Sequence, residues 1–212
     1  MDIRSDSLVL GLGIGIVGVS FGVLAGATGL PPLQACAMSA LVFTGASQFA
    51  AVGVIGAGGS PLAAVATGLL LGARNAGYGL YVSSHLHGHP LLRALEAHLT
   101  IDESTAMAAA HPDQPRRGFL WAGLSIFVAW NLGTLIGVLS GEALDPHALG
   151  LDVALPAAFL ALLVPHLGAA PGRWAAIAGA TVALVATPLT AAGVPILLAA
   201  SGALVALRTS EP

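Results

Sequence analysis

Residues 8–29 read LVLGLGIGIVGVSFGVLAGATG, and this stretch of 22 residues contains no charged side chain. A helix needs about 20 apolar residues to cross the hydrocarbon core of a bilayer. The stretch is therefore predicted to be a transmembrane helix. We do not expect it to be a cleaved signal peptide, because Asp2 and Asp6 are incompatible with a basic leading segment and the apolar run is too long.

The remainder of the chain has the same character. Of its 212 residues, 56% are apolar and 8% are charged, whereas a soluble domain carries about 25% charged residues. This composition excludes a soluble enzyme and predicts an all-α polytopic membrane protein in a lipid bilayer. All seven cations are arginines and none forms a basic run, so no nucleic acid partner is expected. The single Cys36 excludes an internal disulfide.

Seven apolar stretches are long enough, or nearly long enough, to cross the membrane. Turns rich in proline and glycine separate several of them. The predicted spans are 8–29, 32–57, 60–84, 118–141, 149–168, 172–190 and 193–208.

The spans fall into two similar halves. Residues 18–26 and 133–141 both read G-x-x-x-G-V-L-x-G. Three spans per half is an odd number, so the halves are predicted to enter the membrane from opposite sides, as an inverted repeat with broken helices. The glycines recur every fourth residue and either pack closely against a neighbouring helix or form a surface on which one half moves. Within the single transmembrane domain 1–212, the parts are a first repeat 8–84, a cytoplasmic connection 85–117, a second repeat 118–190 and an extra helix 193–208.

Arginine counting predicts the orientation. With seven spans, one side of the membrane holds Arg93, Arg116, Arg117, Arg173 and Arg208, and the other holds Arg4 alone. Because arginine accumulates on the cytoplasmic side, we expect the 85–117 connection and the C-terminus in the cytoplasm and the N-terminus outside.

Polar residues interrupt two of the spans. Gly45, Ala46, Ser47 and Gln48 lie in the middle of the second span, where a broken helix would expose backbone groups to a substrate. Alternatively, Ser47 and Gln48 hydrogen-bond a neighbouring helix and serve only its packing.

Arg74, followed by Asn75, lies within the third span. An arginine at the membrane centre costs about 2.5–3.5 kcal/mol on insertion scales. An acidic partner or a bound carboxylate would offset this cost, or the side chain extends to the interface. Trp130 and Asn131 are further polar candidates for substrate binding.

Three acids are candidates for proton coupling: Asp102, Glu103 and Asp152. Each has a simpler explanation, because acids are also favoured at helix starts. His85, His87 and His89 alternate in a loop but lack the spacing of a metal site, so we expect neither a metal nor a cofactor.

Several of these segments resemble the AzlC family, the large subunit of bacterial branched-chain amino acid exporters. The resemblance covers nearly the whole chain, and its most specific parts are four segments: 43–50 (FTGASQFA), 100–104 (TIDES), 130–134 (WNLGT) and 150–159 (GLDVALPAAF). The family often has Asn-x-Arg at Arg74. Here Gly72 takes the place of that asparagine and Asn75 follows the arginine. The family pattern therefore does not assign the asparagine's role to Asn75, which is kept as a substrate-binding candidate beside Arg74.

The resemblance implies export of valine, leucine and isoleucine, with methionine as a further candidate. The sequence has no P-loop for ATP chemistry, so we expect the export to be proton-coupled. It also implies a bacterial inner membrane location and a small AzlD-type membrane subunit as partner. Two other classes compete with this hypothesis. An intramembrane hydrolase would use Ser47 as its nucleophile with a histidine such as His166, and a membrane scaffold would transport nothing.

Overall fold

The computed structural model describes residues 2–140, 160 and 163–209, and every regular element in this part of the chain is a helix. Two helices, α1 (Ile3–Ala27) and α8 (Pro115–Leu139), each have 25 residues and are apolar enough to cross a membrane. At 1.5 Å per residue each is about 37 Å long, which exceeds the ~30 Å of bilayer hydrocarbon. The first and fourth predicted spans are therefore confirmed as continuous helices over the described residues.

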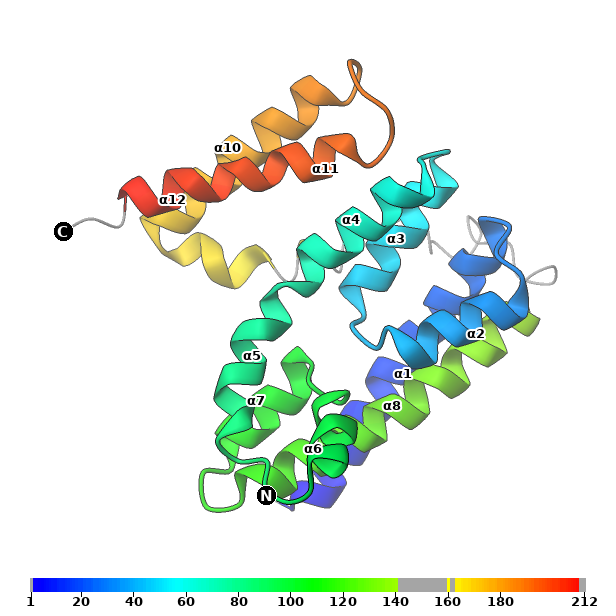
Figure 1. Ribbon diagram of the computed structural model, residues 1–212, viewed down its shortest axis with the longest axis vertical. Helices are drawn as coiled ribbons and strands as arrows, with labels where there is room; N and C mark the ends of the chain where they lie inside the picture. Colours follow the sequence, from blue (N-terminus) through cyan, green and yellow to red (C-terminus); the bar gives the residue numbers. More distant parts are fainter. Residues whose placement is uncertain (1, 141–159, 161–162, 210–212) are drawn as a thin grey trace.

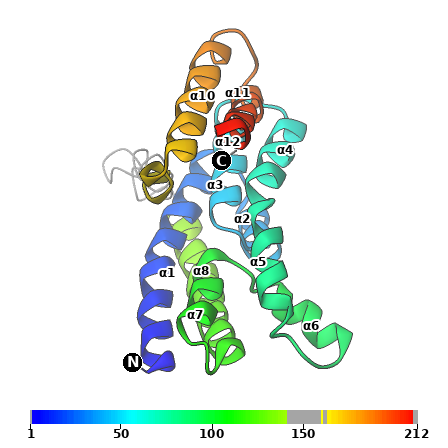
Figure 2. The ribbon, with the colours of Figure 1, turned by 90° about the vertical axis from the view of Figure 1, so that its left-hand side faces the viewer.

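Helices α1 and α8 lie side by side and run in the same direction (Figures 1 and 2). Their contact is made by glycines. A Cβ atom added at Gly22 would overlap the carbonyl oxygen of Thr134, and one at Gly137 would overlap that of Val19. The two copies of the glycine motif thus pack directly against each other, which agrees with the predicted close packing.

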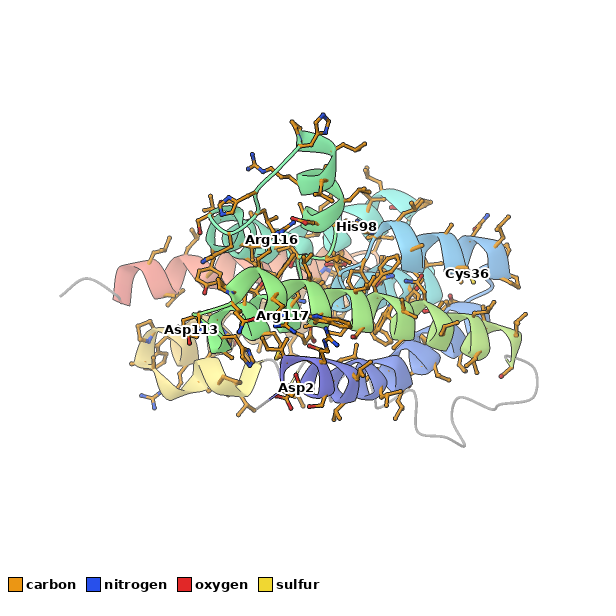
Figure 3. The ribbon with its side chains drawn as sticks, turned by 90° about the horizontal axis from the view of Figure 1, so that it is seen from below. Asp2, Cys36, His98, Asp113, Arg116 and Arg117 are labelled. Carbon is orange, nitrogen blue, oxygen red and sulfur yellow. The ribbon has the colours of Figure 1, made fainter. Side chains whose placement is uncertain are left out.

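This parallel arrangement corrects the predicted orientation of the two halves. An inverted repeat requires α1 and α8 to run in opposite directions, yet Arg4 near the start of α1 lies 5.0 Å from the ring of Trp121 near the start of α8. Figure 3 shows Asp2 and Arg117 at the same end of the helix pair. The N-terminus and the start of α8 therefore lie at the same end of the helix pair, which corrects the prediction that the first helices of the two halves run antiparallel.

The second predicted span, 32–57, consists of two helices, α2 (Pro32–Leu41) and α3 (Ala46–Gly56). The segment turns back on itself, because Gly56 at the end of α3 packs on Thr28 at the end of α1. Its turn lies beside the middle of α8, where the ring centroids of Phe43 and Phe127 are 5.1 Å apart. Residues 32–57 thus begin and end near the same end of α1, which corrects the prediction of one continuous span.

The third predicted span, 60–84, is formed by α4 (Pro61–Gly72) and α5 (Arg74–Ser83), which meet at Ala73. Helix α4 packs along α3. Helix α5 continues to the other end of the molecule, where Val82 packs with Phe119 of α8. This segment passes from one end of α1 to the other, as the sequence predicted, but with a bend in the middle.

The 85–117 connection contains α6 (Pro90–Ala97) and α7 (Asp102–Ala110). Glu96 forms an ion pair with Arg116 at the start of α8. The turn between α6 and α7 extends to the middle of α8, where the rings of His98 and Phe127 are 5.7 Å apart. The connection therefore returns into the helical body instead of remaining wholly outside it.

The C-terminal part contains η1 (Val164–Gly168), α10 (Ala170–Ala186), α11 (Val194–Ala199), η2 (Ala200–Gly202) and α12 (Ala203–Thr209). Helix α10 packs against the elements that follow it, and the turn between them brings Gly193 against Val54 of α3. Most of the fifth predicted span, 149–168, lies outside the described residues.

Candidate functional site

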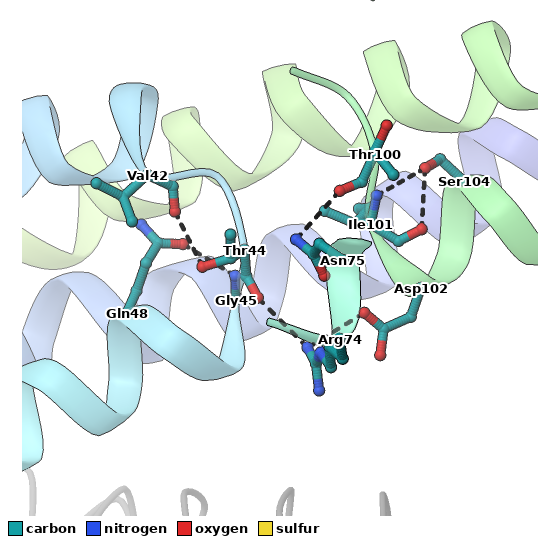
Figure 4. A network of polar contacts seen from close by, with 10 residues as sticks. All are labelled: Val42, Thr44, Gly45, Gln48, Arg74, Asn75, Thr100, Ile101, Asp102 and Ser104. Atoms are coloured by element: carbon teal, nitrogen blue, oxygen red, sulfur yellow. Dashed lines mark hydrogen bonds and ion pairs between the residues drawn. The ribbon is translucent and has the colours of Figure 1, made fainter. Parts of the chain in front are cut away.

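Three interruptions of the helices meet beside the middle of α8 (Figure 4). They are the 42–45 turn between α2 and α3, the α4–α5 bend at Ala73, and the 98–101 turn between α6 and α7. His98 Nε2 lies 2.8 Å from the carbonyl oxygen of Ala40 in α2, so the two turns are directly linked. We call Thr44, Arg74, Asn75, Thr100 and Asp102 the polar junction.

Arg74 lies at the centre of the polar junction. Its Nη2 atom is 3.1 Å from Asp102 Oδ1 and donates to the carbonyl oxygen of Thr44 at 3.5 Å. The Arg74 and Asp102 side chains are 29% and 26% exposed, so neither is sealed inside the protein. The sequence predicted either an acidic partner or a bound carboxylate for Arg74, and Asp102 is that acidic partner.

Asn75, the residue after Arg74, also links α5 to the turn between α6 and α7. Its Nδ2 atom donates to the carbonyl oxygen of Thr100 at 3.3 Å. Ser104 holds the 98–101 turn in place. Its Oγ accepts from the backbone N–H of Ile101 and donates to the carbonyl oxygens of Leu99 and Ile101. The first two residues of α5 therefore hold the start of α7 in place.

Gln48 is fully buried and holds the 42–45 turn together. Its Oε1 accepts from the backbone N–H of Gly45, and its Nε2 donates to the carbonyl oxygen of Met38, both at 3.1 Å. Gly45 has φ +59°, a conformation that glycine adopts at little cost. This geometry favours the alternative reading of Gln48, in which the amide supports the helix break instead of contacting a substrate.

Several buried polar atoms at and beside the polar junction have no hydrogen-bond partner among the described residues. They are Ser47 Oγ, Arg74 Nε and Asn75 Oδ1. Leaving such a group unsatisfied costs about 1–3 kcal/mol. A ligand with both donors and acceptors would satisfy them. Ala46, which the sequence also placed in this site, is the first residue of α3.

Glu103 follows Asp102 in α7, outside the apolar spans. Burial raises the pKa of its carboxyl group, and the neighbouring Asp102 carboxylate acts in the same direction, while Arg74 opposes it. Of the three acids predicted for proton coupling, Asp102 is thus ion-paired with Arg74 and Glu103 has a raised pKa.

Other predicted site residues lie elsewhere. Trp130 is buried among aromatic rings, 5.7 Å from Phe21 and 6.0 Å from Phe49, and the Asn131 side chain donates to the carbonyl oxygen of Phe127 in its own helix. Neither belongs to the polar junction. Asp152 lies outside the described residues.

Sequence reasoning missed Thr44 and Thr100, which contribute backbone carbonyl oxygens to the polar junction. A backbone acceptor leaves no trace in side-chain chemistry. The signal that could have identified them is their position inside the two segments that carry the family resemblance, 43–50 and 100–104.

Comparison with known proteins gives consistent matches. Residues 9–144, more than half of the chain, match the family described as AzlC protein. An uncharacterized membrane protein of Archaeoglobus fulgidus is 33% identical over 87% of this chain and 83% of its own length. Inner membrane protein YgaZ of Escherichia coli is 29% identical over 75% of this chain and 69% of its own. An uncharacterized membrane protein of Helicobacter pylori is 26% identical over 72% and 69%, respectively. No solved structure matches.

Proposed function

Because the chain belongs to the AzlC family of membrane proteins, we propose that it is a transporter, not an enzyme, that exports branched-chain amino acids across the cell membrane. Valine, leucine and isoleucine are the proposed substrates, with methionine as a further one. Export is proposed to be proton-coupled and to require a small AzlD-type subunit. The choice of substrate side chain and of subunit comes from the family resemblance.

The observation that supports transport is the polar junction itself. An arginine inside an apolar helical body is costly, and here it lies where three helix interruptions meet. Irregular backbone at membrane depth is tolerated where it is buried in protein or lines a cavity. Membrane transporters use such interrupted helices to bind ions and charged substrate groups.

The substrate range is expected to be broad. One methylene group in an apolar pocket changes binding by only about 1–3 kcal/mol. A site that recognises the amino-acid head strongly and the apolar side chain weakly therefore accepts several branched-chain substrates.

The proposed subunit needs a contact surface other than the glycine faces of the two long helices. The glycine faces of α1 and α8 cover each other. The exposed leucine and isoleucine side chains of α1, namely Leu8, Leu12 and Ile16, remain available to lipid or to another membrane helix.

The orientation that accompanies this proposal follows from the parallel helices. Arg4, Arg116 and Arg117 belong to the shared end of α1 and α8. By the positive-inside rule, that end is cytoplasmic, and so is the N-terminus. The cytoplasmic C-terminus stays a prediction.

The test is counterflow of labelled leucine into proteoliposomes, with and without the small subunit. We expect uptake by the wild type with its subunit, none with Arg74→Gln, and wild-type uptake with the control Arg93→Gln, since Arg93 is exposed. Arg74→Lys should restore only part of the rate, because lysine lacks the planar fork of donors. Absence of leucine uptake by the wild type with its subunit would contradict the proposal.

The two alternatives are less well supported. A hydrolase requires a base within hydrogen-bond reach of its nucleophile, whereas Ser47 Oγ has no hydrogen-bond partner in the described part of the chain. A scaffold has no need of an ion pair at interrupted helices. The same proteoliposome assay separates a scaffold from a transporter.

A further inference from the structure

The Arg74–Asp102 ion pair uses little of the binding capacity of either partner. The contact joins one nitrogen of Arg74 to one oxygen of Asp102, although a guanidinium has five N–H donors and a carboxylate has two oxygens. Arg74 Nε is buried and has no partner among the described residues. Because Nη2 also donates to the Thr44 carbonyl oxygen, a donor that remains for a second carboxylate while the pair is closed is the Nε–H group.

The charges of the pair match those of an α-amino acid. The α-amino acid zwitterion carries one carboxylate and one ammonium close together, so it can enter between a cation and an anion without changing the net charge. Removing either charge from water without a partner is costly, and insertion leaves all four charges paired. Asn75 Oδ1, which also has no partner in the described region, offers a further acceptor for the ammonium.

We propose that the Arg74–Asp102 ion pair opens to receive the head group of the substrate, with the carboxylate binding Arg74 and the ammonium binding Asp102. This inference rests on the proposed function and assigns the residue that recognises the amino group.

The same arrangement links substrate release to a proton. When a proton binds a carboxylate oxygen of Asp102, that residue loses its charge and no longer holds the ammonium. The zwitterion leaves intact, and no covalent bond of the substrate forms or breaks. Proton and amino acid thus compete for Asp102, so one proton enters for each amino acid exported. The other titratable or charged groups facing Asp102 are Arg74 and Tyr78 of α5 and Glu103 of α7.

Opening the pair also changes how the helices are held. Arg74 connects the 42–45 turn to the start of α7 through Thr44 and Asp102. A substrate that takes both charges releases this connection. Binding at the polar junction is therefore expected to free the two turns from each other, which a transporter requires to expose its site on alternate sides.

The experiment compares three probes for binding to the full chain with its small subunit in nanodiscs. Leucine has both charges, 4-methyl-2-oxopentanoate lacks the ammonium, and 3-methylbutan-1-amine lacks the carboxylate. The variants are Asp102→Asn and Arg74→Gln, and the control is Asp113→Asn at an exposed aspartate. A thermal melt of each variant verifies folding.

We expect the wild type and Asp113→Asn to bind leucine about tenfold or more tighter than either analogue, since each charge-assisted contact is lost separately. Asp102→Asn should lose about tenfold or more in leucine affinity while keeping its affinity for the oxo acid. Arg74→Gln should weaken both. If Asp102→Asn does not fold, Asp102→Glu should still prefer leucine to the oxo acid, with lower affinity.

Two results overturn this inference while leaving the proposed function intact: leucine binding by folded Asp102→Asn equal to that of the wild type, or an equal loss for leucine and the oxo acid. A preference of Asp102→Glu no greater than that of Arg74→Gln overturns it as well. Failure of the wild type to bind leucine at all overturns the proposed function and the inference together.

Discussion

Gln48 and Met38 are joined across the interruption between α2 and α3, where Gln48 Nε2 donates to the Met38 carbonyl oxygen at 3.1 Å. The other end of the same amide accepts from Gly45. Gln48→Ala leaves the backbone N–H of Gly45 without its partner, whereas the Met38 carbonyl oxygen still accepts from the backbone N–H of Val42. An unsatisfied buried group costs about 1–3 kcal/mol.

We therefore expect Gln48→Ala to lower the melting temperature of the detergent-solubilised protein, and leucine export to fall with the loss of folded protein. The control is Gln34→Ala, at an exposed glutamine of α2, which should leave melting unchanged. A Gln48→Ala protein that melts like the wild type but no longer binds leucine would return Gln48 to the substrate site.

The glycine contact of α1 and α8 predicts a large difference between two glycines of one helix. A Cβ atom at Gly22 overlaps the Thr134 carbonyl oxygen, whereas nothing lies within 4 Å of one at Gly13. Gly22→Ala should destabilise the protein by about 1–3 kcal/mol through overpacking, and Gly13→Ala should be neutral. Thermal melts of both variants test this, and equal melting temperatures would contradict the observed helix packing.

The parallel direction of α1 and α8 predicts that Ser5 and Asp113 lie on the same side of the membrane. In a Cys36→Ser background, Ser5→Cys and Asp113→Cys should both react with a membrane-impermeant maleimide only in inverted membrane vesicles. Both positions are outside the buried core. Labelling of the two cysteines from opposite sides would support the seven-span prediction instead.

Glu103 predicts a pH dependence of stability. Burial raises its pKa above the ordinary value of 4.5, so the folded protein binds this proton more tightly than the unfolded chain. The free energy of unfolding is then greatest below the unfolded pKa and falls as the pH rises through the folded pKa, by at most about 1.4 kcal/mol per pH unit.

Thermal melts at about pH 4 and about pH 8 should show a smaller decrease for Glu103→Gln than for the wild type. The glutamine has no proton to lose. Asp113→Asn, at an exposed carboxylate, is the control and should show the wild-type decrease. An unchanged pH response in Glu103→Gln would contradict the role given to burial.

The features that the sequence predicted correctly depend on local composition. The uncharged run of α1 and the glycine spacing of both long helices were sufficient to identify two spans and their close packing. Gly45 marked a helix break because its neighbours are polar, and the structure gives it a positive φ. Arg74 required compensation inside an apolar segment, and the compensating residue is Asp102.

The features that the sequence did not predict depend on contacts between residues that are far apart in the chain. A run of apolar residues has the same hydropathy whether it crosses a bilayer or turns back halfway, so 32–57 was interpreted as a span. That error added one predicted span between α1 and α8, so the two helices were predicted to run antiparallel when they are parallel. The packing of Gly56 on Thr28, which reveals the turn, joins two residues that no local pattern connects.

The glycine contact of α1 and α8 also has a consequence for biogenesis. Eighty-seven residues separate the end of α1 at Ala27 from the start of α8 at Pro115, and synthesis at about 5–20 residues per second makes the interval on the order of ten seconds. During this time the glycine face of α1 is covered by lipid, the insertion machinery or a neighbouring chain. Assembly of the helix pair is thus a late event, and the order in which the helices emerge determines how long α1 remains without its permanent neighbour.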